Sequence, residues 1–162
     1  MIMMRDAQTY TFHTRSMQET QELAESVGRL VEPGDVFTLT GDLGAGKTTF
    51  TQGLARGMDI SGIVNSPTFT IIKEYMGRLP LYHMDVYRME DELEDLGFDE
   101  YFYGDGVTVV EWPQMIAEQL PAERCEIAIT RGEGDERTLI FTAYGRRYEI
   151  VCEAIKNDHS GN

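Results

Sequence analysis

Three glycines, a lysine and a threonine stand at fixed spacing in Gly41–Thr48, whose sequence is Gly-Asp-Leu-Gly-Ala-Gly-Lys-Thr. This order fits the phosphate-loop (P-loop) pattern G-x-x-x-x-G-K-[ST], in which backbone N–H groups surround phosphate oxygens. Lys47 would bring a positive charge to the β- and γ-phosphates, and the Thr48 hydroxyl would bind Mg²⁺. The segment therefore predicts a site for a nucleoside triphosphate and its magnesium ion.

The residues on either side of the loop predict the two elements that must position it. Asp35–Thr40 is short and rich in β-branched and aromatic residues, which is typical of a buried strand. Residues 48–58 carry apolar side chains at helical spacing, with Gly57 near the predicted end. A helix that begins near Gly46 would direct its positive dipole end at bound phosphates. This order of strand, loop and helix favours a phosphate-binding loop over an ordinary glycine-rich turn.

Two carboxylates at the ends of predicted strands are candidates for chemistry beside the loop. Glu111 follows the apolar strand Val107–Val110, and Asp85 follows the more polar strand Leu81–Met84. A site that hydrolyses nucleotides needs a carboxylate near Mg²⁺, and a second one can orient the attacking water. Either side chain could instead be structural and accept hydrogen bonds from an arginine or a backbone N–H. The residues alone leave the two roles open.

Three further candidates draw attention by their positions. The loop Asn65–Thr70, which contains Thr68, follows the predicted P-loop helix and could sense a γ-phosphate through a hydroxyl. A plain turn before a strand is the alternative for this loop. His83 is expected to be packed or hydrogen-bonded within its strand rather than to bind a metal. Trp112, the single tryptophan, belongs either to the core or to an exposed position beside the site.

The composition limits the classes of function. The chain has 162 residues, with 14 Lys+Arg against 28 Asp+Glu and a net charge of −14. A chain this acidic is a poor direct binder of nucleic-acid backbone, which needs clustered basic residues. The charge suits a basic protein partner, or it serves solubility alone.

The cysteines and the N-terminal residues predict a cytoplasmic protein. Cys125 and Cys152 are too few and too far apart in the sequence for a zinc site or a disulfide framework, which indicates a reducing compartment. Met1–Thr14 contains charged residues and lacks the long apolar core of a signal peptide. No run approaches the ~18 apolar residues that a membrane span needs, so no membrane association is expected.

Strands that alternate with helices around the loop predict an α/β fold. We expect a P-loop NTPase-like three-layer sandwich, with helices on both faces of a mainly parallel sheet and some antiparallel strands. A single domain is expected over residues 1–156, followed by a disordered tail over 157–162. The other predicted strands are Thr9–Thr14, Phe69–Tyr75, Leu79–Asp85, Glu126–Thr130, Thr138–Ala143 and Arg147–Val151, and the other helices are Ser16 to about Leu30, Met89–Leu96 and Gln114–Leu120.

Four blocks of the sequence together resemble the TsaE family, small bacterial ATPases of tRNA threonylcarbamoyladenosine biosynthesis. After the P-loop come Ser-Pro-Thr-Phe-Thr, Tyr-His-Met-Asp-Val-Tyr-Arg and Val-Glu-Trp-Pro, in the family's order. The four ordered blocks are far more specific than the P-loop alone. The chain departs little from the family pattern: Gln114 follows the last block where an acid is common. The blocks are Gly41–Thr49, Ser66–Thr70, Tyr82–Arg88 and Val110–Pro113.

The resemblance implies a P-loop ATPase that uses ATP and Mg²⁺ and works with the TsaD–TsaB protein pair. That system modifies adenosine 37 of tRNAs that read codons beginning with A. In this interpretation the protein binds the TsaD–TsaB complex and resets it by ATP hydrolysis, which is slow without the partners. It does not transfer the threonylcarbamoyl group itself, and no direct contact with nucleic acid is expected.

The resemblance also assigns the metal and hydrolysis roles that the residues left open. Thr48 and Glu111 would hold Mg²⁺. Asp85, in the His-x-Asp-x-Tyr-Arg block, would be the acidic residue needed for hydrolysis, together with Lys47 at the phosphates and Thr68 in a switch-like loop.

Nucleotide contacts follow from the same resemblance. Trp112 would lie close to the nucleotide, and the base would be held near Ser16 and Arg137. The complete set of expected ATP-binding residues is Gly41, Asp42, Leu43, Gly44, Ala45, Gly46, Lys47, Thr48, Thr49, Ser16, Trp112 and Arg137.

Two other functions fit a P-loop protein of this size. A small-molecule kinase would use the same loop, but it usually needs arginine-rich lid segments, and the acidic region Met89–Glu100 offers none. A nucleotide-dependent switch, whose hydrolysis only times release from a partner, is close to the family interpretation. Transfer of phosphate to a metabolite rather than to water would favour the kinase.

Overall fold

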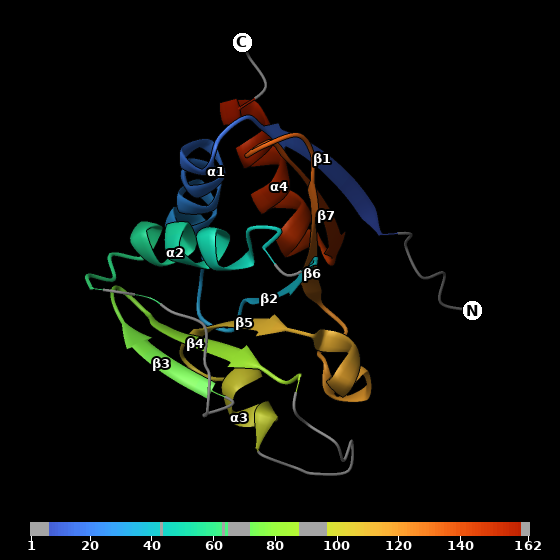
Figure 1. The fold of residues 1–162 in the computed structure, drawn as a ribbon. Helices are drawn as coiled ribbons and strands as arrows, with labels where there is room; N and C mark the ends of the chain where they lie inside the picture. Colours follow the sequence, from blue (N-terminus) through green and yellow to red (C-terminus); the bar gives the residue numbers. More distant parts are fainter. Residues whose placement is uncertain (1–6, 43, 63, 65–71, 88–96, 160–162) are drawn as a thin grey trace.

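A computed structural model of the chain describes residues 7–42, 44–62, 64, 72–87 and 97–159 (Figure 1). The predicted order of strand, P-loop and helix is present as β2, the loop and α2. Within the described ranges, no helix has the length and apolar character needed to cross a membrane. In chain order the elements are β1 (Gln8–Thr14), α1 (Met17–Leu30), β2 (Val36–Thr40), α2 (Lys47–Gly57), β3 (Ile72–Met76), β4 (Pro80–Asp85), α3 (Phe98–Phe102), β5 (Val107–Glu111), the 3₁₀ helix η1 (Pro113–Gln119), β6 (Arg124–Arg131), β7 (Arg137–Tyr144) and α4 (Arg146–His159).

The strands form a mixed, seven-stranded sheet in the order β1-β7-β6-β2-β5-β4-β3. β6, β2, β5 and β4 are parallel neighbours, whereas the pairs β1–β7, β7–β6 and β4–β3 are antiparallel. The predicted α/β class is confirmed, but parallel and antiparallel pairings are equal in number, so the sheet is not mainly parallel. The cause lies in the connections, because the short turns of β3–β4 and β6–β7 can join only antiparallel strands.

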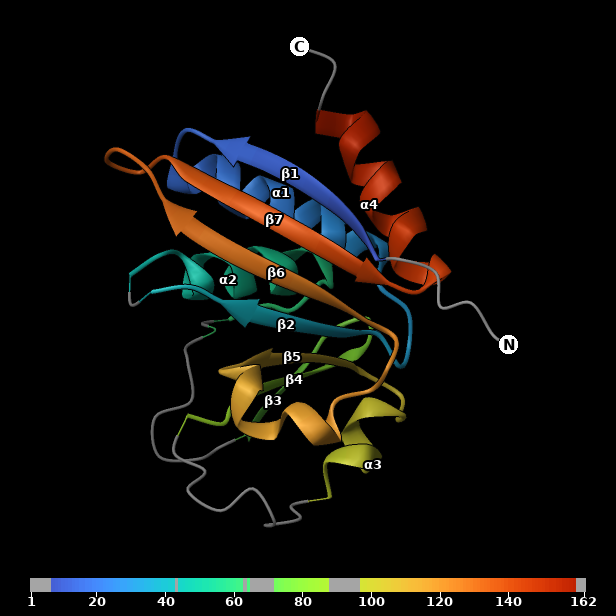
Figure 2. The same ribbon diagram turned by 90° about the vertical axis from the view of Figure 1, so that its right-hand side faces the viewer.

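Alternate side chains of the central strands enter two separate cores, one on each face of the sheet. Phe37 and Leu39 of β2 pack with buried side chains of α1, α2 and α4. Val36 lies on the opposite face, in a smaller core with Phe98 of α3 and Ile116 of η1. Figure 2 shows α1 and α2 behind the strands, and α3 at the lower end of the sheet. Helical segments therefore cover both faces of the sheet, α1, α2 and α4 on one face and the short α3 and η1 on the other.

Helices α1 and α2 pack with their backbones in direct contact, through glycines on both helices. A Cβ atom added to Gly28 would overlap the carbonyl oxygen of Leu54 and lie 2.9 Å from Cα of Gly57. A Cβ added to Gly53 would lie 2.9 Å from the Cβ of Ala24. Only glycine permits this approach, which places α1 directly against the helix that follows the P-loop.

The C-terminal segment is a helix, and the predicted strand Arg147–Val151 is wrong. The stretch Tyr-Glu-Ile-Val favours a strand locally, but the spacing of the buried side chains is helical. Helix α4 continues to His159, so residues 157–159 of the expected tail are helical, while 160–162 lie outside the described residues. The buried apolar side chains of α4 are Tyr148, Val151, Cys152 and Ile155.

Two predicted segments, the loop Asn65–Thr70 and the acidic helix Met89–Leu96, also lie outside the described residues. The predictions for these two segments stay untested.

The first helix begins as expected, because the Ser16 hydroxyl oxygen caps α1 by accepting the Glu19 N–H at 3.1 Å.

The two cysteines, which are far apart in the sequence, meet between β6 and α4. Cys125 and Cys152 are both fully buried and free. A hydrogen bond to Cys152, together with burial, raises the pKa of the Cys125 thiol well above its usual value. A buried thiol with a raised pKa stays protonated and unreactive, so this pair serves packing.

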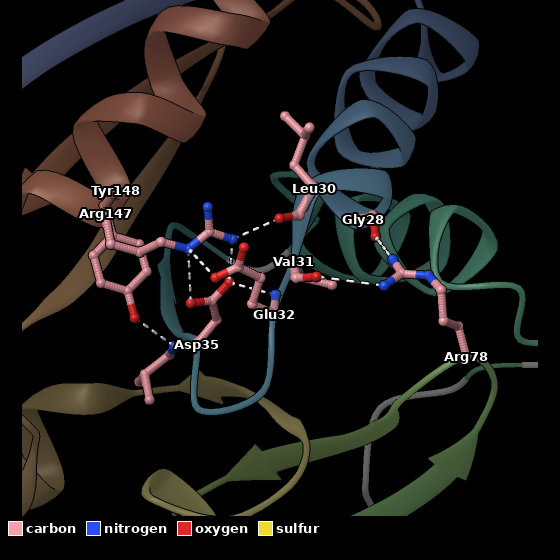
Figure 3. A network of polar contacts seen from close by, with 9 residues as sticks. Gly28, Leu30, Val31, Glu32, Asp35, Arg78, Arg147 and Tyr148 are labelled. Atoms are coloured by element: carbon pink, nitrogen blue, oxygen red, sulfur yellow. Dashed lines mark hydrogen bonds and ion pairs between the residues drawn. The ribbon is translucent and has the colours of Figure 1, made fainter.

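A polar network holds the start of β2 against α4, as Figure 3 shows. The buried carboxylate of Asp35 accepts a hydrogen bond from the Arg147 guanidinium at 2.8 Å. Arg147 also donates to the carbonyl oxygen of Leu30 at the end of α1. The Tyr148 hydroxyl oxygen accepts the Val36 N–H at 2.8 Å, and burial raises the pKa of Tyr148, so its hydroxyl stays neutral. Helix α4 thereby fixes the strand that carries the P-loop.

The carboxylate of Asp35 should stabilise the whole fold. Asp35→Ala removes the buried carboxylate that pairs with the Arg147 guanidinium and the acceptor of the Glu32 N–H, so we expect the free energy of unfolding to fall by about 3 kcal/mol. Glu32→Gln is the matched control, because this carboxylate is 66% exposed and 3.5 Å from Arg147 Nε, and we expect a change below about 0.5 kcal/mol. Urea unfolding measures both, and equal losses would contradict the assignment.

Candidate functional site

The P-loop connects β2 to α2 at the carboxyl ends of the parallel strands. Gly41, Gly44 and Gly46 have φ values of 152°, 80° and 115°, which side-chain-bearing residues rarely adopt. A Cβ on Gly41 would lie 2.6 Å from the carbonyl oxygen of Ile129 in β6. The glycines of the motif are thus required by the path of the chain itself. Leu43 of the loop lies outside the described residues.

The loop residues divide between an exposed and a buried side. Asp42, Gly44 and Thr48 are exposed, whereas Ala45 and Thr49 are buried. The exposed side, with the N-terminus of α2, is the surface that a phosphate chain could reach.

Both candidate carboxylates end neighbouring strands on the face of the sheet that α2 covers. Asp85 of β4 and Glu111 of β5 are direct partners in the parallel register. The alternation of side chains puts them on the same face as Leu81 and Val109, which belong to the core under α1 and α2. The structure therefore brings the two carboxylates together beside the P-loop, as their positions at strand ends suggested.

Lys47 and Glu111 form a buried ion pair between the P-loop and β5. Lys47 Nζ lies 3.9 Å from Glu111 Oε1, and the two residues are 9% and 4% exposed. Glu111 is thus the carboxylate in direct reach of the P-loop lysine. In Asp85, Oδ1 accepts the backbone N–H of Tyr87 at 3.1 Å.

His83 is the second partner of Glu111. Its Nε2 lies 2.6 Å from Glu111 Oε2, and its side chain is fully buried. The prediction of a packed or hydrogen-bonded histidine is confirmed, but its partner, Glu111, was not predicted. Strand alternation was the available signal. His83 and Asp85 are two residues apart, so their side chains lie on the same face of the sheet, which is the face of the site.

Trp112 lies beside the site rather than in the centre of a core. Lys47 Nζ is 4.8 Å from the centroid of the tryptophan ring, in a cation–π arrangement. The ring of Tyr87, which is 58% exposed, also packs against Trp112, with 4.7 Å between the ring centroids. Trp112 also has a positive φ of 62°, an uncommon conformation for a large side chain. Trp112 thus combines the two alternatives, because it is half-buried against the smaller core and also lies next to Lys47.

Arg137, expected near the base, is tied to the backbone of the P-loop. Its Nε donates to the Ala45 carbonyl oxygen at 2.7 Å, and Nη2 lies 3.4 Å from the Gly44 carbonyl oxygen. Its Nη1 donates to the carbonyl oxygens of Gly134 and Glu136 at 2.8 Å each. This buried guanidinium connects the β6–β7 turn to the P-loop. No local sequence pattern predicts this role.

The structure says less about the two remaining expected residues, Ser16 and Thr68. Ser16 uses its hydroxyl to cap α1, just after β1, whose Thr14 pairs with Arg137 in β7. Thr68 lies outside the described residues, so its role stays a prediction.

Known proteins resemble this chain in sequence and in fold. A family model described as threonylcarbamoyl adenosine biosynthesis protein TsaE matches residues 14–139, which include the P-loop, both carboxylates and Arg137. The chain belongs to the TsaE family. It is therefore a member of a family that acts in the biosynthesis of threonylcarbamoyladenosine in tRNA.

Individual relatives cover most of this TsaE-family chain. The tRNA threonylcarbamoyladenosine biosynthesis protein TsaE of Bacillus subtilis is 60% identical over 153 residues, which are 93% of this chain and 97% of the relative. The TsaE protein of Treponema pallidum is 47% identical over 118 residues, 72% of this chain and 87% of the relative. The crystal structure of Bacillus subtilis YdiB superposes with a TM-score of 0.84 at 52% identity, over 95% of this chain and 98% of that one.

The contacts of Arg137 predict that it orders the P-loop. Arg137→Met removes donors to four carbonyl oxygens, so we expect faster amide hydrogen exchange at residues 44–46 and a stability loss of about 2–3 kcal/mol. Arg124→Met is the matched control, because Arg124 also donates to carbonyl oxygens, those of Pro121 and Ala122, but at the start of β6, away from the P-loop. Unchanged loop exchange in Arg137→Met would contradict the bracing role.

Proposed function

We propose that this TsaE-family chain is a Mg²⁺-dependent ATPase. One observation carries the proposal: the ammonium of Lys47 and the carboxylate of Glu111 meet at 3.9 Å, where the P-loop joins the carboxyl ends of the parallel strands. A P-loop needs this combination, with a cation for the phosphates and a carboxylate for the metal side of the nucleotide. Membership of the TsaE family supports the same activity.

The donors at the site fit magnesium. Thr48 and Glu111 would hold the ion through hard oxygen atoms, which Mg²⁺ prefers. The described residues contain no cluster of three metal-binding side chains, and Mg²⁺ at nucleotide sites typically takes only one or two protein ligands beside phosphates and water. When bound, the ion would neutralise charge on the β- and γ-phosphates.

Groups of the chain itself would bind the phosphates and orient the attacking water. The N–H groups of Gly41–Thr49 and the Lys47 ammonium bind the phosphates and stabilise the charge that develops on them. Asp85, with Oδ1 held by the Tyr87 N–H, orients the attacking water, and Thr68 contributes from its loop. Trp112 flanks the nucleotide beside Lys47.

We place the adenine base on the side of the P-loop where β1 meets β7. Ser16 follows β1, and Arg137 begins β7 with its guanidinium under the loop. In this arrangement Arg137 acts mainly by supporting the loop, and Ser16 lies at the edge of the base site.

The proposed role of hydrolysis is to reset the TsaD–TsaB complex between rounds of tRNA modification. The chain supplies no threonylcarbamoyl transfer of its own in this proposal. Its net charge of −14 suits a protein partner better than direct contact with the tRNA backbone.

Substitution of Lys47 and Asp85 should separate binding from turnover. Lys47→Ala removes the cation at the phosphates, so we expect ATP affinity to fall by about 100-fold. Asp85→Ala should bind ATP normally and lose about 100-fold or more in turnover, because it lacks the group that orients water. Calorimetry and phosphate release measure the two effects. Asp105→Ala, at an exposed turn, is the control, and normal hydrolysis by Asp85→Ala would refute its role.

Partner dependence tests the biological part of the proposal. We expect slow phosphate release from the isolated chain and at least about 10-fold faster release with the TsaD–TsaB pair, because groups supplied by a partner can complete a P-loop site. With AMP-PNP in place of ATP, one round of tRNA modification should proceed but not repeated rounds. Full activity of the isolated chain, unchanged by the pair, would contradict this role.

A further inference from the structure

A histidine occupies a position of β4 that is buried on both sides. His83 is fully buried and follows Leu81 on the face of the sheet that packs under α1 and α2. Strands that are covered on both faces usually carry apolar side chains, because a buried polar group needs a partner. Packing alone therefore does not account for an imidazole here.

The imidazole has one partner among the described residues, and that partner is Glu111. Nε2 lies 2.6 Å from Glu111 Oε2, whereas Nδ1 has no hydrogen-bond partner within the described part of the chain. A carboxylate only accepts hydrogen bonds, so Nε2 carries the hydrogen and donates it. The single polar contact of His83 is directed at the carboxylate of the site.

The two carboxylate oxygens of Glu111 have different partners. Oε2 accepts from His83, while Oε1 lies 3.9 Å from Lys47 Nζ at the start of the P-loop helix. The hydrogen bond to Oε2 fixes the rotation of the carboxylate. As a result Oε1 is the oxygen that faces the P-loop.

We propose that His83 is a positioning residue that keeps Oε1 of Glu111 directed at the P-loop and thereby sets the magnesium requirement of nucleotide binding. The inference rests on the proposed function, in which Glu111 is a metal ligand. Partners that orient a ligating carboxylate typically change metal affinity by about 10–100-fold when they are removed.

Two substitutions separate this role from simple filling of the core. His83→Leu keeps much of the volume and removes the donor, whereas His83→Gln keeps a side-chain N–H near the place of Nε2. Binding of AMP-PNP to the full chain is measured by calorimetry across a magnesium series and in the presence of EDTA. Thermal unfolding of each variant reports the effect on the fold separately.

We expect His83→Leu to need about 10–100-fold more Mg²⁺ for half-maximal binding, with an unchanged affinity in EDTA. His83→Gln should stay close to the parent chain. If His83→Leu does not fold, His83→Asn replaces it, because its shorter amide does not reach Oε2 and should show the same increase.

Three results would overturn the inference. A parental magnesium requirement in His83→Leu or His83→Asn would show that the contact does not position Glu111. An equal defect in His83→Gln would show that the N–H is not the relevant feature. Failure of the parent chain to bind AMP-PNP with Mg²⁺ would instead remove the proposed function, and the inference with it.

Discussion

The arrangement of the site depends on one buried carboxylate that has two partners from different parts of the fold. Glu111 on β5 meets Lys47 from α2 and His83 from β4. A charge buried in this way destabilises a protein unless its partners are held in place. The parallel alignment of β2, β5 and β4 is what brings the three groups to one point. A change in the register of these strands would therefore separate the three groups of the site.

The strand that carries the P-loop is secured at both ends by the C-terminal part of the chain. At its start, Arg147 and Tyr148 of α4 hold Asp35 and the Val36 N–H. At its end, Arg137 of β7 holds the carbonyl oxygens of the loop. The C-terminal strands and helix thus contribute to the site without supplying any of its acidic groups.

Local patterns in the sequence were sufficient for the P-loop with its strand and helix, the Ser16 cap and the β3–β4 hairpin, because each depends on neighbouring residues. The share of antiparallel pairs was underestimated and helix α4 was missed, since strand pairing is set by distant segments and a short apolar stretch suits either element. The contacts of His83 and Arg137 also join residues far apart in the chain. The family resemblance supplied the roles of the carboxylates, which spacing alone left open.

The glycine contact between α1 and α2 has a mechanical consequence. At Gly28 and Gly57 no side chain lies between the two backbones to change rotamer and absorb a displacement, so the two helices resist sliding past each other there. Helix α1 and the helix behind the P-loop should then behave as one rigid body. A shift of α2 would then carry α1 with it, so the position of the P-loop helix and that of α1 are coupled.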